Sequence, residues 1–432
     1  MKILHTVESY LPARHGMSEV VRQISERLVA KGHEVTVVTG QHPDRTMTHI
    51  SGVEVKSFDV HGKSALGIMG DVEGYQQYLI NSNPDIITNF AAQQWATDLA
   101  IPLLGELRAK KVFVPTGFSG LYDPAYNKYF ASMGDWMHSY DACVFLSDNY
   151  RDINFARNAE VNKIATIPNG AAADEFDRKP DPEFRARLGI PEDDFLIIHV
   201  AGYLSVAKGQ IEALRIFNES GLRNATLLLI CGEFAEGWSS GLTPRKLARG
   251  CWQLLRGRGL SGFVPAWQLG VRRWFAKKQN TAFRRSLLTA SLSREDTVSA
   301  FQNADLLLFP SWIECSPLVL FEAAASSTPF LVTDVGNSAE IIRWTGGGRL
   351  LPGVRKSDRE GSVVADIPES ALMLEGIWKD KATREVMAAS AHAAWEKSFT
   401  WEIIADQYEA LYLALQRGED IRGQFNPPPE LV

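Results

Sequence analysis

The chain has 432 residues, of which 45% are hydrophobic and 22% are charged, and its 45 Lys and Arg are outnumbered by 51 Asp and Glu. This length exceeds what one hydrophobic core usually supports, so we expect two or three domains, and the composition is that of a soluble globular protein. No apolar run is long enough to span a membrane, and the start MKILHTVESY has neither a cationic region nor a cleavage site. These features argue against an integral membrane protein and against secretion.

The four cysteines are scattered without the spacing of a metal site; they are Cys143, Cys231, Cys251 and Cys315. Isolated cysteines of this kind are typical of reduced thiols in the cytoplasm. We therefore expect a cytoplasmic protein without a zinc or iron centre.

The first half of the chain alternates strands and helices, which is typical of a Rossmann-like domain. We expect strands over residues 2–7, 34–39, 53–60, 85–89, 111–115, 142–147 and 163–168. Helices are expected over 18–31, with Ser18 as the N-cap, over 74–80, and over 96–109, the last kinked or restarted at Pro102. We place the first domain over residues 1–180.

The second half repeats this alternation and predicts a second Rossmann-like domain over residues 181–398. Its expected strands cover residues 195–200, 225–231, 306–309 and 329–335, and its expected helices cover 210–218 and 318–325. A further helix is expected over 399–417, followed by a tail over 418–432.

Two carboxylates follow the strand at 306–309. Glu314 lies in the loop after this strand, and Glu322 lies about one turn into the next helix. Ligands of parallel α/β sheets bind outside the carboxyl ends of the strands, so both carboxylates can face a ligand. The backbone N–H groups of Ser316, Leu318 and Val319 lie at the helix start, where an anion is favoured. Because a carboxylate can accept hydrogen bonds from two ribose hydroxyls, the stretch predicts a sugar-nucleotide site.

The stretch PSWIECSPLVLFEAAASSTPFLVTDVGNSAEII, over residues 310–342, resembles the E-x7-E signature of the retaining, family 4 glycosyltransferases with the GT-B fold. The resemblance implies two doubly wound Rossmann-like domains facing across a cleft, the first on the acceptor side and the second binding the nucleotide sugar. It also implies that the helix at 399–417 crosses back to the first domain. It implies that Glu322 binds the donor ribose, while Glu314, with Ser316, Pro317 and Leu318, binds the transferred sugar or β-phosphate. Retention implies front-face attack by the acceptor hydroxyl, with the leaving phosphate taking the proton.

The loop after the strand at 195–200 resembles the family's G-R-x4-K-G loop, whose cations neutralise the donor diphosphate. It begins at Gly202 and keeps Lys208, but Tyr203 stands at the Arg position. Earlier, His15-Gly16 stands where the family has a Gly-Gly pair. Gly16 keeps the implied place beneath the donor phosphate and acceptor, while His15 either contacts acceptor or phosphate or is a solvated loop residue. The implied catalytic residues are Glu314 and Lys208.

A second departure concerns a histidine that many relatives carry after the strand at 111–115. Here Thr116-Gly117-Phe118 follows the strand. The histidine's role is either absent or taken by His138, Tyr122 or Asp123, and the sequence does not choose among them. Because this chain lacks the family's Arg and His, we also consider an alternative hypothesis. In it the chain is a catalytically impaired protein of this fold that acts as a membrane-associated binding or scaffold protein.

Residues 237–285 contain eleven Lys or Arg, four Trp and no Asp or Glu, and they lie outside the family pattern. Basic faces opposed to Trp, Phe and Leu suggest an interfacial helix on anionic lipid at the inner face of the plasma membrane. Two other hypotheses are a basic channel for an anionic acceptor and a helical subdomain packed on the protein. No nucleic-acid recognition motif accompanies the charge, so we expect no nucleic-acid partner.

Together these features predict a metal-independent glycosyltransferase of the hexosyltransferase type, with a basic helical insertion in its second domain. We expect a UDP- or GDP-sugar donor, no other cofactor, and a glycan or lipid-linked acceptor. The expected pathway is polysaccharide or glycolipid biosynthesis.

Overall fold

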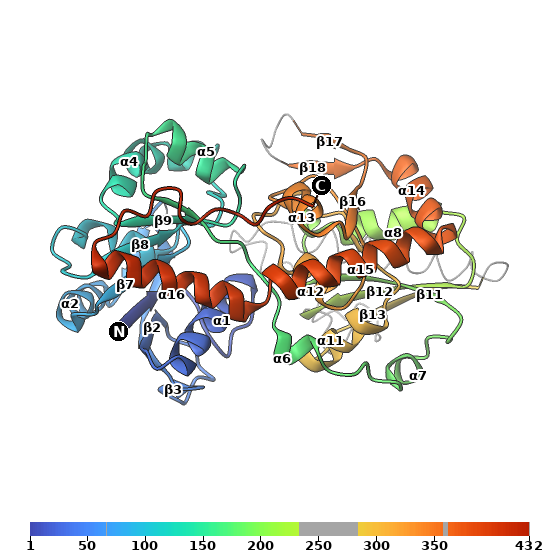
Figure 1. The fold of residues 1–432 in the computed structure, drawn as a ribbon, viewed down its shortest axis with the longest axis horizontal. Coiled ribbons are helices and arrows are strands. Elements are labelled where there is room, and N and C mark those ends of the chain that lie inside the picture. Colours follow the sequence, from blue (N-terminus) through green and yellow to red (C-terminus); the bar gives the residue numbers. More distant parts are fainter. Residues whose placement is uncertain (66, 233–283, 357–361, 432) are drawn as a thin grey trace, which may run out of the picture. The chain divides into compact units, whose positions relative to one another are not determined.

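The computed structural model describes residues 1–65, 67–232, 284–356 and 362–431, and its chain folds into two compact units (Figure 1). Unit 1 comprises Met1–Ala172, Cys315–Leu318 and Ser398–Pro429, and unit 2 comprises Ala173–Glu314, Val319–Lys397 and Glu430–Val432. The chain thus passes from unit 1 to unit 2 after Ala172, whereas our sequence-based boundary lay at residue 180. The insertion hypotheses for 237–285 lie outside the described residues, except at Arg284 and Arg285.

Unit 1 is built on an eight-stranded sheet that is parallel except for β3, which pairs antiparallel with β4. In sheet order the strands are β10 (Ile164–Thr166), β9 (Ala142–Phe145), β8 (Lys110–Val114), β7 (Ile86–Phe90), β1 (Lys2–Thr6), β2 (Glu34–Gly40), β4 (Val53–Phe58) and β3 (His49–Ile50). A hairpin of β5 (Val60–Lys63) and β6 (Gly67–Gly70) follows β4. The direction of winding reverses between β1 and β7, and such switch points are where ligands of doubly wound sheets bind.

The helices of unit 1 are α1 (Gly16–Ala30), α2 (Val72–Ser82), α3 (Trp95–Asp98), α4 (Asn127–His138), α5 (Arg151–Asn158) and the C-terminal α16 (Trp401–Arg417), with 3-10 turns η1 (Ile101–Leu103) and η2 (Pro124–Tyr126). Helix α16 lies beside α1 (Figure 1) and buries Ile404, Tyr408 and Leu411 in the same core. Ion pairs of Arg27 with Glu402 (2.6 Å) and of Lys31 with Glu409 (2.8 Å) join the two helices. Apolar burial along one helix face, rather than these half-exposed pairs, holds α16 in place.

Two sequence-based predictions in unit 1 were wrong. The N-cap of α1 is His15, not Ser18: the His15 ring accepts from Ser18 N (3.4 Å), and the Ser18 hydroxyl accepts from His15 N (2.9 Å). An imidazole nitrogen thus takes the place of the usual cap oxygen. The helix expected over 96–109 is interrupted before Pro102, as predicted, but it consists only of the short α3 and η1 and does not reach residue 109. Pro102 lacks the N–H that a continuous helix would use there.

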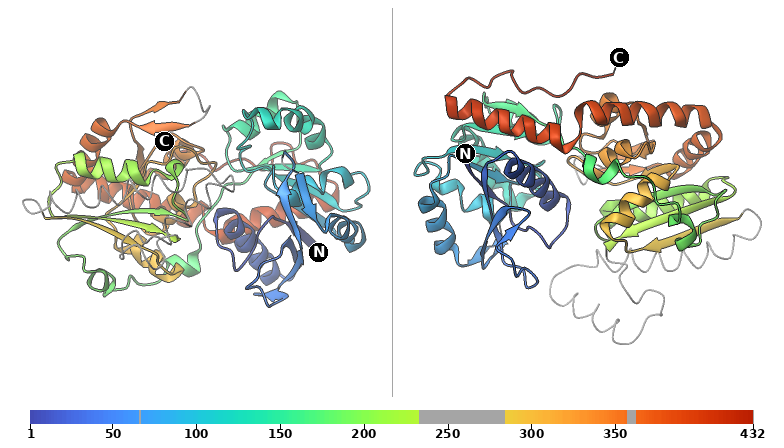
Figure 2. Two further views of the ribbon diagram at one scale, coloured as in Figure 1. Left: turned by 180° about the vertical axis from the view of Figure 1, so that it is seen from behind. Right: turned by 60° about the horizontal axis from the view of Figure 1, so that its bottom comes forward.

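Unit 2 is built on a six-stranded parallel sheet with helices on both faces (Figure 2). In sheet order the strands are β13 (Arg285–Ala290), β12 (Ala225–Cys231), β11 (Phe195–Ala201), β14 (Leu306–Phe309), β15 (Phe330–Val332) and β16 (Gly348–Leu350). Strands β12, β14 and β15 are buried along their whole lengths, as expected for a sheet covered on both faces. The winding reverses between β11 and β14, so the loops after these two strands meet at a switch point.

The remaining elements of unit 2 surround this sheet. They are α6 (Ala173–Phe176), α7 (Phe184–Leu188), η3 (Val206–Lys208), α8 (Gln210–Glu219), α11 (Arg294–Asn303), α12 (Leu318–Ala325), α13 (Ser338–Thr345), α14 (Ile367–Lys379), α15 (Lys381–Ser398) and the hairpin of β17 (Gly353–Arg355) and β18 (Val363–Ala365). Among the helices that the structure describes, none is long and apolar enough to cross a membrane.

Candidate functional site

The loops after β11 and β14 bring together the two residues that we predicted to be catalytic. Lys208 Nζ lies 2.8 Å from Glu314 Oε1, and the Ser311 hydroxyl donates to the same oxygen (2.7 Å). The two charged side chains are 22% and 12% exposed. Burial alone would lower the pKa of Lys208, but the charge and hydrogen bond of Glu314 outweigh it and raise the pKa above its ordinary value. A fixed ammonium group therefore stands at the switch point of the unit 2 sheet.

Three features fix the backbone of the loop that carries Lys208. Gly209 has φ +74°, and a Cβ there would lie 2.1 Å from the Pro310 carbonyl oxygen, so only glycine allows the two loops this close approach. Trp312 N donates to Ala207 O (2.8 Å) and ties the second loop to the first. His199, buried in β11, donates from Nε2 to Lys208 O (2.8 Å). The Lys-Gly pair therefore carries both the charge and the turn that positions it.

We expect His199 to make the folded chain sensitive to acid. Burial lowers the pKa of His199 from 6.5 to about 4. Between pH 6.5 and 4 the unfolded chain therefore binds a proton that the folded chain does not. The contribution of His199 to the free energy of unfolding is complete above pH 6.5, declines as the pH falls from 6.5, and is lost below pH 4. The shift corresponds to about 3 kcal/mol. Urea unfolding at pH 7.5 and 4.5 should show a smaller loss of stability in His199→Gln than in wild type.

The exposed His49 supplies the control for this measurement. His49→Gln should keep the pH dependence of the wild type, because it replaces a histidine on the surface and leaves the buried His199 in place. Equal pH dependence in wild type and His199→Gln would overturn the prediction.

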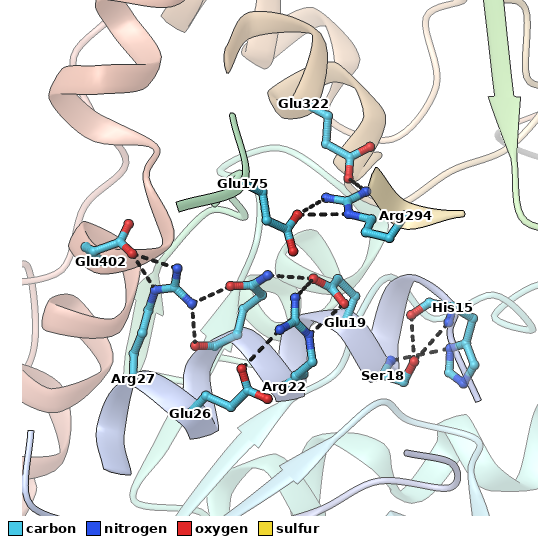
Figure 3. Close-up of polar contacts among 11 residues, drawn as sticks. His15, Ser18, Glu19, Arg22, Glu26, Arg27, Glu175, Arg294, Glu322 and Glu402 are labelled. Carbon is cyan, nitrogen blue, oxygen red and sulfur yellow. Dashed lines mark hydrogen bonds and ion pairs between the residues drawn. The ribbon is translucent and has the colours of Figure 1, made fainter. Parts of the chain in front are cut away.

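A second cluster of charges surrounds Glu322, which is 7% exposed on α12. Arg294 Nη1 donates to Glu322 Oε1 (2.6 Å), while Arg294 Nη2 and Nε donate to Glu175 Oε2 (2.6 and 2.8 Å) (Figure 3). The guanidinium also lies over the Phe176 ring, 5.5 Å from its centroid. One arginine therefore bridges two carboxylates and fixes the orientation of Glu322.

Our sequence analysis missed Arg294. It is the first residue of α11, directly after the Ser293 N-cap, in the segment that follows β13. A cation at a helix N-terminus is unfavourable to the helix dipole. An arginine at this unfavourable position indicates that other contacts stabilise it. Because the segment also follows the carboxyl end of a parallel strand, where ligands bind, the sequence did offer a signal that could have identified Arg294.

The other donor-binding residues that we predicted are placed as follows. Tyr203 is half exposed, and Lys208 Nζ lies 5.8 Å from its ring centroid, so the residue at the family's Arg position contacts the retained cation. Gly202 begins this loop, and a Cβ there would meet no atom within 4 Å. Ser316, Pro317 and Leu318 belong to unit 1, where Asn169 Nδ2 donates to Ser316 O (3.2 Å). Donor contacts of these residues remain predictions.

In unit 1 the two candidate histidines have structural contacts. His15 caps α1 (Figure 3), its Nε2 contacts the Ser9 hydroxyl, and burial lowers its pKa, which favours the neutral ring. His138 ends α4 and donates from Nε2 to Ala159 O (2.9 Å). Gly16 begins α1, and a Cβ there would meet open space. Substrate contacts of these three residues also remain predictions.

In the described ranges, no group of three or more His, Cys, Asp or Glu could hold a metal ion.

Two protein-family models match the chain. Glycosyltransferase Family 4 matches residues 14–175, and Glycosyl transferases group 1 matches residues 272–360, which together make up more than half of the chain. An uncharacterized glycosyltransferase of Methanocaldococcus jannaschii is 23% identical over 95% of this chain and 98% of its own length. The chain belongs to the family 4 type of glycosyltransferases.

This glycosyltransferase has the GT-B fold, as its sequence predicted. Sucrose-phosphate synthase of Thermosynechococcus elongatus superposes with a TM-score of 0.70 at 17% identity, covering 96% of this chain and 99% of the other. HepE of Anabaena, solved in complex with UDP-glucose, superposes with a TM-score of 0.66 at 16% identity, covering 95% and 99%. At such identities these likenesses establish the fold alone.

Proposed function

We propose that this glycosyltransferase transfers a sugar from a UDP- or GDP-sugar to a glycan or lipid-linked acceptor, with retention of configuration and without a metal ion. The observation that carries the proposal is the Lys208–Glu314 pair at the switch point of the unit 2 sheet. A diphosphate leaving group needs a cation where its charge develops, and Lys208 is a charged, partly buried group held in one place. We assign the reaction to the cytoplasm and to polysaccharide or glycolipid biosynthesis.

Each residue then has one role. Lys208 binds the diphosphate, and Glu322, oriented by Arg294, accepts hydrogen bonds from the ribose hydroxyls. Glu314 and the backbone N–H groups after Cys315 contact the transferred sugar or the β-phosphate. HepE, which shares the fold, has been solved with UDP-glucose, and this supports a nucleotide sugar as the donor.

The chemistry follows from these roles. The bond between the anomeric carbon and the phosphate oxygen breaks, and the acceptor hydroxyl attacks the same face of the sugar. Its proton passes to an oxygen of the leaving phosphate, so no carboxylate pair is required. Lys208 stabilises the negative charge that grows on the diphosphate. The remaining rate enhancement comes from holding donor and acceptor in contact.

Calorimetric titration with a panel of UDP- and GDP-sugars, followed by product analysis, tests the proposal. We expect one donor to bind with micromolar affinity and Glu322→Ala to weaken it about thirtyfold, which corresponds to about 2 kcal/mol for hydrogen bonds to a charged group. Glu369→Ala, an exposed position in the first turn of α14, is the matched control and should bind like wild type. Absence of binding by every nucleotide sugar would overturn the proposal, and binding without transfer would favour a scaffold role.

A further inference from the structure

Helix α15 donates side-chain hydrogen bonds to the C-terminal ends of α12, α13 and α14, and Figure 1 labels all four helices. The bonds run from His392 Nδ1 to Ala325 O of α12 (2.9 Å), from Ser390 Oγ to Thr345 O of α13 (2.9 Å) and from Arg384 Nη1 to Trp378 O of α14 (2.6 Å). The last carbonyl groups of a helix have no partner within it and need one from outside. Because α12 carries Glu322, the bond from His392 bears on the candidate donor site.

The last four carbonyl groups of α12 are all hydrogen-bonded. Three accept from the turn that follows the helix: Glu322 O from Ser326 N (3.1 Å), Ala323 O from Thr328 N (2.8 Å) and Ala324 O from Ser327 N (3.1 Å). The fourth, Ala325 O, accepts from His392, which lies 67 positions further along the chain. The turn moves together with the helix that it closes, whereas His392 belongs to a different helix. The bond from His392 therefore fixes the end of α12 relative to α15.

The imidazole of His392 is itself held in place. Its ring packs against the ring of Trp395, with the centroids 5.2 Å apart, and Trp395 is buried. One position before His392, Ala391 lies so close to the segment after α13 that a Cβ at Gly347 would lie 2.6 Å from the Ala391 Cβ. Since both the ring and the helix that carries it are closely packed, the N–H group of His392 points in a fixed direction.

The capped end of α12 lies close to Glu322. The helix has eight residues, Leu318–Ala325, so Glu322 lies about one turn before the carbonyl group that accepts from His392. A shift of this end would move the backbone of Glu322 with it. Arg294 orients the carboxylate of Glu322, but it does not fix the helix from which that side chain projects. The two contacts therefore control different coordinates of the same carboxylate.

We propose that His392 is a positioning residue for donor binding, because its bond to Ala325 O holds α12 where Glu322 reaches the donor ribose. This inference rests on the proposed function, since it takes Glu322 to bind the ribose. In this role His392 does not contact the donor and acts through α12 alone. Loss of the bond is expected to weaken donor binding and to leave the transfer step of the bound donor nearly unchanged.

Steady-state transfer with the donor identified by calorimetry tests this role. His392→Phe keeps an aromatic ring beside Trp395 but removes the N–H group, and we expect the donor KM to rise about tenfold with kcat within about twofold of wild type. His392→Asn carries an amide N–H group as far from the backbone as Nδ1, so its KM should return to within about threefold of wild type. Rescue by asparagine would assign the effect to the hydrogen bond.

A double variant separates an effect through Glu322 from a general one. Once Glu322 is alanine, His392→Phe should raise KM by less than about twofold more, because the group that it positions is gone. A further tenfold rise in Glu322→Ala/His392→Phe would mean that His392 acts elsewhere, and it would overturn the inference.

Arg384→Met is the matched control on α15. It removes the bond to the end of α14, a helix to which no donor contact is assigned, and should leave the donor KM unchanged. Thermal unfolding shows which variants are folded, and His392→Leu is measured in place of His392→Phe if the latter is not. An unchanged KM in the folded His392 variant, or an equal rise in Arg384→Met, would contradict a positioning role. Unchanged donor affinity in Glu322→Ala would instead count against the proposed function.

Discussion

Replacement of Lys208 by methionine is expected to lower kcat/KM for sugar transfer about a thousandfold. Removing one group that stabilises a developing negative charge typically costs two to three orders of magnitude, and we expect the upper end here. The reason is local: Tyr203 stands at the position of the family's arginine, so it cannot share the charge of the diphosphate. The measurement is steady-state transfer with the donor identified by calorimetry.

A structural loss must be separated from this catalytic one. Lys208→Met leaves the partly buried Glu314 without the ammonium group that lies 2.8 Å away, and breaking such a pair destabilises proteins. The double variant Lys208→Met/Glu314→Gln removes the remaining charge and should recover most of the stability, but not the activity. Recovery of both would mean that Lys208 serves only to pair with Glu314.

Lys356 provides the matched control for Lys208. Its ammonium group lies 4.3 Å from the ring centroid of Trp312, and Trp312 lies in the same loop as Glu314. Lys356→Met should keep kcat/KM within a fewfold of wild type, because no role for this cation in the transfer step is proposed. A thousandfold loss in this variant as well would point to general disruption of the loop.

The fold of unit 2 and its E-x7-E segment could be predicted because their signals are local. The buried strand at 306–309 and the helix at 318–325 are short apolar runs bounded by loop residues, and the structure has them at those bounds. Lys208 was identifiable from the loop pattern around Gly209. Its contact with Glu314 joins residues 106 positions apart and depends on the order of β11 and β14, which short-range patterns do not encode.

The features that escaped prediction depend on distant contacts or on unusual local chemistry. Arg294 meets Glu175 and Glu322 only because α6, α11 and α12 come together around the folded sheet of unit 2. Ala91 and Thr116 have positive φ, which could not be anticipated, since neither residue type favours it. His15 escaped because cap prediction relies on hydroxyl and carboxylate side chains.

The second large effect concerns Arg294, which we regard as a positioning residue. Arg294→Met should raise the KM for the donor about a hundredfold and change kcat at saturating donor by less than threefold. This exceeds the effect of Glu322→Ala, because truncating Glu322 leaves Arg294 paired with Glu175, whereas truncating Arg294 leaves two neighbouring carboxylates without their shared guanidinium. Repulsion between these carboxylates would turn Glu322 away from the ribose.

Steady-state kinetics on three variants decides whether Arg294 acts in this way. Arg294→Lys keeps the charge but cannot bridge both carboxylates with a planar fork, so its KM should lie between those of wild type and Arg294→Met. Arg187→Met breaks an exposed ion pair to Asp296 on the same helix α11 and should leave KM unchanged. Tighter donor binding by Arg294→Met would mean that Arg294 competes with the ribose for Glu322. A fall in kcat at constant KM would place Arg294 at the reacting groups instead.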